Sequence, residues 1–136
     1  MILKIYSDGG ARGNPGPAAI GVVIYGDSQK ITEFGEKIGL ATNNFAEYTS
    51  LETALVRAAA ICQRERVELI EVFMDSQLVI NQITGQFKIK NSQLAKILGR
   101  ILSLEKKLPK IKYNLVAREN NRQADKLVNL ALDQSP

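Results

Sequence analysis

The chain has 136 residues, of which 45% are hydrophobic and 24% charged, and its formal net charge is +4. This composition is ordinary for a soluble globular protein and excludes collagen-like, disordered and membrane-embedded classes. The length suits one compact domain, so we expect a single domain over residues 1–136. The apolar stretch after Met1 is too short for a signal peptide, and no later run approaches the roughly 20 apolar residues of a membrane span. We therefore expect a cytoplasmic protein.

Three strands joined by short turns open the chain. Ile2–Ser7 is rich in β-favouring residues, and we expect this strand to end at Asp8, which would form an acidic tip. Glycine, asparagine and proline at 13–17 give a dense turn signal, which the apolar strand Ala18–Tyr25 follows. The segment Lys30–Ile38 alternates imperfectly and is the third expected strand. Such short connections predict an antiparallel meander.

A long helix is predicted next, followed by a strand and a short helix. Asn43 or Asn44 can cap a helix that ends near Arg64, because apolar residues recur at helical spacing between them. Glu68–Met74 reads as a strand that ends at an aspartate. The following helix is expected over Gln77–Ile83, and a glycine stops it.

The last third of the chain repeats this alternation. After the basic segment Gln86–Asn91, Ser92 is expected to cap a helix with an apolar stripe. A strand at Lys112–Val116 and a terminal helix, capped by Asn120 or Asn121, complete the order βββαβααβα. This order predicts an α/β fold with a mixed sheet that is flanked by helices.

The charge distribution and the residue types present indicate that any catalytic groups are carboxylates. Residues 69–136 contain eleven Lys and Arg against six Asp and Glu, so the second half is the basic half and can meet phosphates, although a solvated helix face has the same pattern. Histidine is absent, which removes the commonest general base and transition-metal ligand. The single cysteine, Cys62, lies in an alanine-rich helical pattern and is expected to be a small buried hydrophobic residue.

Four acidic residues occupy positions from which they can converge. Asp8 and Asp75 end the first and fourth strands, and parallel neighbours would bring them within about one sheet spacing, roughly 4.8 Å. Glu47 is expected in the first turn of the long helix and Asp125 early in the last helix. Each acid alone has a simpler explanation, as a turn residue or as a partner of the helix dipole. Together they would repel one another unless hard cations such as Mg²⁺, Mn²⁺ or Ca²⁺ bound there.

Such a site is suited to phosphodiester hydrolysis. Two cations about 3.5 to 4 Å apart can activate a water and stabilise the leaving oxygen without a protein base. The acids lie in four motifs: SDGGARGNPG at 7–16, TNNFAEY at 42–48, MDSQLVINQITG at 74–85 and VARENNRQADKL at 116–127. With these motifs in this order, nearly the whole chain resembles the type 1 ribonuclease H family.

That resemblance implies a ribonuclease H-like fold with a five-stranded mixed sheet whose first three strands are antiparallel. It implies a metal-binding catalytic tetrad of Asp8, Glu47, Asp75 and Asp125, and cleavage of the RNA strand of RNA/DNA hybrids with Mg²⁺, or with Mn²⁺ as a substitute. A side activity on double-stranded RNA is left open. The implied substrate contacts are Gly9, Gly10, Gly13, Asn14, Asn43, Asn44 and Gln77. Capping and turn formation are the simpler roles for these glycines and amides.

The chain departs from the family pattern in three places. Many relatives carry a histidine before the last helix, where this chain has Arg118, and we expect Arg118 to replace it in part. A full basic protrusion is not expected, so Lys88, Lys90 and Lys96 are the candidates for contacts with the DNA strand. No separate hybrid-binding domain is expected before residue 1, so affinity should fall steeply with salt.

Two alternative functions are compatible with the same acids or with the same fold. A junction resolvase or an integrase-like nuclease would retain the tetrad but cut DNA, and the amides at Asn43, Asn44 and Gln77 argue against it. A non-catalytic nucleic-acid-binding domain would not need all four acids. We expect a monomer with no membrane association.

Overall fold

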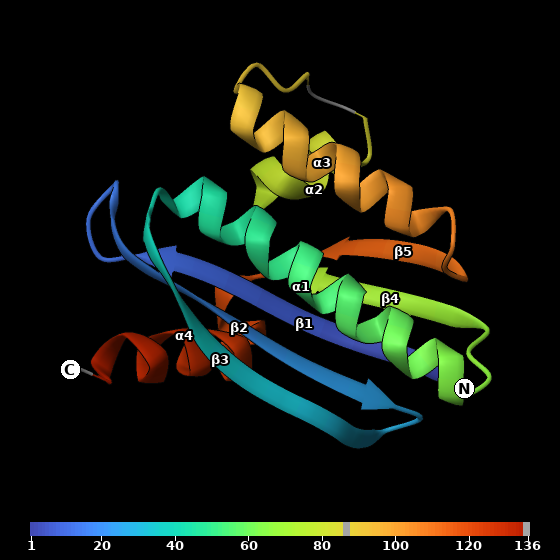
Figure 1. The fold of residues 1–136 in the computed structure, drawn as a ribbon. Helices are drawn as coiled ribbons and strands as arrows, with labels where there is room; N and C mark the ends of the chain where they lie inside the picture. The colour runs from blue at the N-terminus through green and yellow to red at the C-terminus, as the bar shows by residue number, and fades with distance from the viewer. Residues whose placement is uncertain (86–87, 135–136) are drawn as a thin grey trace.

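A five-stranded mixed sheet runs through the molecule, in the order β3-β2-β1-β4-β5 (Figure 1). The structure is a computed structural model and describes residues 1–85 and 88–134. Strands β1 and β2 pair antiparallel, as do β2 and β3, whereas β4 pairs parallel with both β1 and β5. The predicted mixed sheet with three antiparallel strands at the start is confirmed. The strands are β1 Ile2–Ala11, β2 Gly16–Gly26, β3 Gln29–Ala41, β4 Leu69–Met74 and β5 Lys110–Leu115.

Helices cover both faces of this sheet. Helix α1 crosses one face, where α2 and α3 lie beside it, and α4 packs on β1, β2 and β3 from the other face (Figure 1). The predicted element order is confirmed, with one added 3-10 turn, η1, before α4. No helix in the described ranges is both long and apolar enough to cross a membrane. The helices are α1 Asn43–Arg64, α2 Gln77–Ile83, α3 Ser92–Glu105, η1 Arg118–Asn120 and α4 Arg122–Asp133.

The main core lies between the sheet and α1. Along β1 the pleat alternates, so that Leu3 and Ile5 are fully buried while Lys4 is exposed on the other face. Tyr48 of α1 is also fully buried, and its hydroxyl donates a hydrogen bond to Gln82 Oε1 of α2 at 2.5 Å. Since this hydroxyl has a partner, the ring can be buried without leaving an unpaired polar atom. Cys62 is a free, partly buried cysteine that packs against this core.

Several predicted boundaries differ from the structure. The first strand does not end at Asp8, because antiparallel pairing with β2 continues through Ala11. Gly9 and Gly10 are compatible with a turn, but here both are paired with β2 and belong to the strand.

Two of the predicted helix caps shift by one residue, whereas the cap position of α4 is Asn121, one of the two residues predicted for it. Thr42, not Asn43 or Asn44, caps α1, because its side chain accepts a hydrogen bond from Phe45 N at 3.1 Å. Asn91, not Ser92, caps α3. The position preceding α4 is Asn121, whose side chain makes no capping hydrogen bond. The basic segment Gln86–Asn91 lies partly outside the described residues, which omit 86 and 87.

Candidate metal-dependent active site

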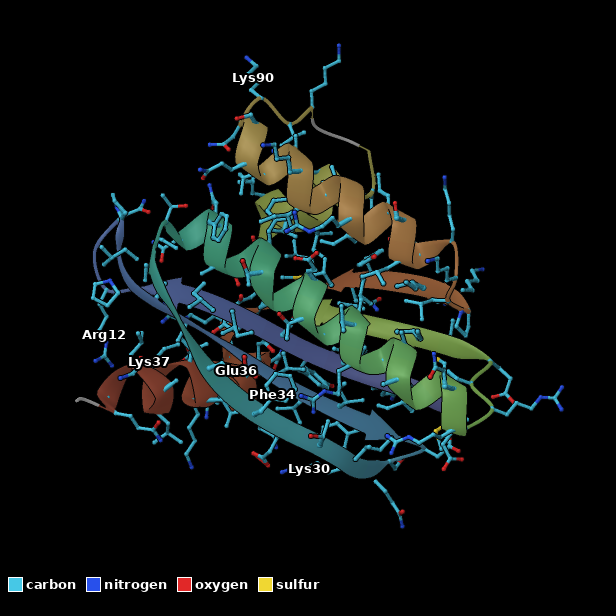
Figure 2. All side chains as sticks on the ribbon, in the orientation of Figure 1. Arg12, Lys30, Phe34, Glu36, Lys37 and Lys90 are labelled. Carbon is cyan, nitrogen blue, oxygen red and sulfur yellow. The ribbon has the colours of Figure 1, made fainter. Side chains whose placement is uncertain are left out.

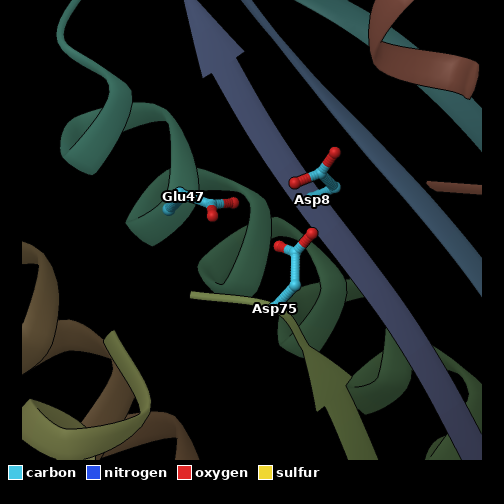
Figure 3. A group of neighbouring side chains, drawn as sticks. All are labelled: Asp8, Glu47 and Asp75. Atoms are coloured by element: carbon cyan, nitrogen blue, oxygen red, sulfur yellow. The ribbon is translucent and has the colours of Figure 1, made fainter. Parts of the chain in front are cut away.

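Three of the four predicted acids meet at one end of the sheet (Figure 3). Asp8, Glu47 and Asp75 each offer a carboxylate oxygen, and these oxygens all lie within 4.8 Å of one another. The three side chains come from β1, from α1 and from the residue after β4 (Figure 3). Residues separated by tens of positions in the sequence therefore form one acidic group.

The sheet itself places Asp8 beside Asp75. Strands β1 and β4 run parallel, and their last paired residues are Tyr6 and Phe73. Asp8 follows Tyr6 by two residues within β1, and Asp75 follows Phe73 by two residues, directly after the end of β4. The expectation that parallel neighbours would bring these two acids together is confirmed.

A glycine lets α1 bring Glu47 to the same place. A Cβ atom at Gly9 would lie 2.2 Å from the carbonyl oxygen of Ala46, so only glycine allows α1 to approach β1 this closely. The backbone N–H of Gly9 then donates a hydrogen bond to Glu47 Oε1 at 2.6 Å. Glu47 is the fifth residue of α1 and lies past its first turn, so the expected position in the first turn is wrong.

A second close approach brings α4 to Asp8. Gly21 of β2 is the antiparallel partner of Asp8, and a Cβ atom there would lie 2.2 Å from the carbonyl oxygen of Ala124. The first turn of α4 therefore rests on the strand next to Asp8, and it carries Asp125. Asp125 lies outside the group of three acids but lines the same pocket, and its Oδ1 is 3.8 Å from the Arg118 guanidinium.

Burial and mutual repulsion shift these carboxyl groups toward their neutral forms. Burial, together with the negative charges of Asp75 and Asp125, raises the pKa of Asp8 to about 8. Burial and the charge of Asp8 also raise the pKa of Glu47. The pKa of Asp75 is raised chiefly by burial, and the nearby Arg118 charge opposes the shift.

This donor set fits a hard divalent cation. All three clustered groups are oxygen donors, and the energetic cost of ionising them side by side is removed when a cation binds. The surrounding pocket, of about 420 Å³, is open and also holds Asp125 and Arg118.

The predicted substrate contacts divide into two groups. Gly9, Gly10, Asn43 and Asn44 line this pocket, whereas Gln77 is exposed at the start of α2 and is not among the lining residues. Lys88, Lys90 and Lys96 are exposed and also lie outside the lining. In Figure 2, Lys90 and Arg12 project outward on opposite sides of the start of α1.

Two of the predicted amide contacts have structural roles. The side chain of Asn43 accepts a hydrogen bond from Ala11 N at 2.8 Å, and Asn14 Oδ1 accepts one from Asn43 N at 3.0 Å. These bonds fasten the turn between β1 and β2 to the start of α1. Gly13 in this turn has a φ of +103°, which explains a glycine there.

Two residues of the site region were not found from the sequence as functional candidates. Arg12 lines the acidic pocket, and its guanidinium donates to Asp133 Oδ1 of α4 at 2.6 Å. Asn121, expected only as a possible cap, is 1% exposed and donates from Nδ2 to the carbonyl of Ser7 at 3.0 Å. Arg12 is part of the first motif, which could have drawn attention to it, but nothing local signals that Asn121 would be buried.

The chain is similar to several known proteins. A family model described as "Reverse transcriptase-like" matches residues 6–131. The "Bifunctional protein Rv2228c" of Mycobacterium tuberculosis is 39% identical over 135 residues, which is 98% of this chain and 36% of that protein. The "Ribonuclease HI" of Halobacterium salinarum is 41% identical over 134 residues, which is 98% of this chain and 65% of that protein. This chain thus spans about a third of the mycobacterial relative and less than two thirds of the other.

A solved structure shows the same fold. LC11-RNase H1, in complex with an RNA/DNA hybrid, superposes with a TM-score of 0.91 and is 39% identical. The match covers 96% of this chain and 96% of that one. A match of this extent shows that the two chains share one fold.

Proposed function

Because this chain belongs to the type 1 ribonuclease H family, we propose that it is an endonuclease that hydrolyses the RNA strand of RNA/DNA hybrids. The observation that carries the proposal is the group of three carboxylates within 4.8 Å, with Asp125 on the rim of the same pocket. The hybrid bound to the similar LC11-RNase H1 supports the choice of substrate.

Asp8, Glu47, Asp75 and Asp125 are the proposed metal ligands, with Mg²⁺ as the natural ion and Mn²⁺ as a substitute. Two cations held by these carboxylates would supply Lewis-acid chemistry, namely activation of a water and stabilisation of charge on the leaving oxygen. The protein positions the proposed ligands through its backbone: the Gly9 N–H donates to Glu47, Asp8 pairs with Gly21 of β2, and Asp75 directly follows β4.

Arg118 is the proposed replacement for the family histidine. Its side chain is 80% exposed and lies on the rim, 3.8 Å from Asp125, so it can meet an entering phosphate or a departing product. Among the residues that line the pocket, Gly10 and Asn44 are the proposed contacts with the hybrid, because the structure gives Gly9 and Asn43 packing and hydrogen-bonding roles. Substrate contacts of Asn14, Gly13, Gln77, Lys88 and Lys90 stay predictions, as do a single catalytic domain over 1–136, a monomeric state and a cytoplasmic location.

A cleavage assay on a uniform RNA/DNA hybrid, with Mg²⁺ and with a chelator, tests this function. We expect cleavage of the RNA strand only when the metal is present. Asp75→Asn, which keeps the shape of the side chain and removes a charge, should lower the rate by roughly a thousandfold or more.

The same assay separates the alternatives. Cleavage of duplex DNA in preference to the hybrid would point to a resolvase or integrase-like nuclease. Metal-independent binding of the hybrid, with no cleavage by the unaltered protein, would favour a binding domain. Parallel reactions on double-stranded RNA show whether that substrate is cut as a side activity.

A further inference from the structure

A second pocket lies on the face of the sheet opposite to α1. Its volume is about 370 Å³, and it shares none of its lining residues with the acidic pocket. Lys4 and Tyr6 of β1 and Tyr25 of β2 form one wall, and the segment 119–123 forms the other. Buried Asn121 belongs to this segment, and its hydrogen bond to Ser7 fastens that wall to β1.

Three aromatic rings lie on this face of the sheet, and α4 covers only part of the face. The close contact of α4 at Gly21 lies toward the acidic end of the sheet, whereas β4 and β5 extend away from that helix (Figure 1). Tyr6 stacks on its strand neighbour Phe73, with ring centroids 4.8 Å apart and an angle of 16° between the planes. Tyr25 meets Tyr6 edge to face at 6.2 Å. All three rings are partly exposed on the sheet.

Cations and amides surround these rings. Lys4 and Arg122 are exposed at the pocket, where Glu119 is the acid among the described lining residues. On the same face, Lys112 lies next to Glu71, which is itself the strand neighbour of Lys4. Gln123 accepts a hydrogen bond from the Tyr25 hydroxyl at 2.6 Å, which holds its amide at the edge of the pocket.

This combination matches the chemistry of an unpaired nucleotide. Partly exposed rings on a sheet provide stacking surfaces for bases, exposed cations attract phosphates, and amides can bind base edges. The volume is also in the range of small-ligand pockets. We propose that this face, through the pocket between Tyr6, Tyr25 and residues 119–123, binds single-stranded nucleic acid. The site is separate from the acidic pocket and does not depend on cleavage.

Anisotropy of a labelled twelve-nucleotide oligothymidylate, measured in a chelator at low salt, tests the proposal. Tyr6→Leu keeps an apolar side chain but removes the flat ring, and we expect it to weaken binding about tenfold. A double variant, Lys4→Ala with Arg122→Ala, should weaken binding several-fold. It should also reduce the slope of log affinity against log salt concentration by about one to two. The matched control, Lys106→Ala with Lys107→Ala, removes the same charge from the turn after α3 and should bind like the unaltered protein.

Two-dimensional amide NMR spectra of the unaltered protein test the proposal without relying on the folding of any variant. Added oligothymidylate should shift the amide signals of Tyr6, Tyr25 and residues 119–123 and leave that of Glu47 in place. Shifts confined to the acidic pocket, or equal affinity in all variants, would overturn the proposal and leave the rings as packing groups. Displacement by an equal concentration of a glutamate-rich peptide would also overturn it, because the site would then select acidic peptides.

Discussion

The inner acids and the rim of the same pocket are held in different ways. Asp8 is only 7% exposed and lies on a strand that is paired on both sides, and Glu47 is fixed by a backbone N–H. At the rim, Arg118 is 80% and Asp125 32% exposed, and their contact spans 3.8 Å. The comparison shows that Asp8 and Glu47 are held by strand pairing, packing and a backbone hydrogen bond, whereas Arg118 and Asp125 at the rim are in contact with solvent.

After the loss of a carboxylate itself, the largest effect on cleavage is expected from a change in the packing behind the inner acids. Gly9→Ala would place a methyl group against the backbone of α1, so α1 or β1 must shift and Glu47 with it. We expect a loss of about 2–3 kcal/mol in the free energy of unfolding and roughly a hundredfold or more in cleavage rate. Urea unfolding measures the free energy of unfolding, and the hybrid assay measures the cleavage rate.

Gly10→Ala is the matched control for this change. Its added Cβ would make an ordinary contact, 3.6 Å from Val128 Cγ1, so stability should change little. Equal destabilisation by the two substitutions would show that the close approach at Gly9 does not position Glu47.

The next effect concerns the dependence of stability on pH. The pKa of Asp8 is raised from 3.8 to about 8 by burial and by its acidic neighbours, so the metal-free folded protein binds more protons than the unfolded chain between these values. Stability without metal should therefore fall as pH rises from about 4 to 8, by on the order of 2–4 kcal/mol.

Asp8→Asn removes this titrating group and serves as the control. In a chelator the variant should be more stable than the unaltered protein at pH 8, and the difference should shrink toward pH 4. Mg²⁺ should raise the melting temperature of the unaltered protein at pH 8 and have a smaller effect on the variant. A metal-free protein whose stability is flat over this range would contradict the raised pKa.

At the rim we expect smaller effects on rate and little effect on stability. Arg118→Ala should lower turnover by about tenfold at saturating hybrid and metal, because an exposed guanidinium can attract phosphate without being part of the core. Arg64→Ala, at the far end of α1, removes the same charge and should leave turnover unchanged. If Arg118→Ala also leaves turnover unchanged, Arg118 does not replace the family histidine.

The smallest effects should come from the exposed lysines before α3. Lys88→Ala and Lys90→Ala should each raise KM for the hybrid a few-fold. Each should also reduce the slope of log KM against log salt concentration by about one. Lys107→Ala is the control for a change of charge outside this segment. KM values that match the control at every salt concentration would remove these lysines from the substrate interface.

The sequence was enough for the order of the elements, and it singled out Asp8, Glu47 and Asp75, whose carboxylates the structure brings together. The bounds of α2 were predicted as found: the structure shows that Ser76 caps its start, and Gly85 follows its end. Asp8 and Asp75 were placed side by side from one argument, that parallel strands end at a common edge. Such features depend on residues close in sequence or on the regular spacing of a sheet.

Tertiary structure alone decided how the site is held together. The sequence shows a glycine at 9 and at 21, but only the packed fold shows that helix backbone fills the space of their missing side chains. The burial of Asn121 and the raised pKa of Asp8 likewise arise from groups that are distant along the chain. Close approach and loss of solvent depend on every surrounding element at once, and residue patterns along one segment do not contain that information.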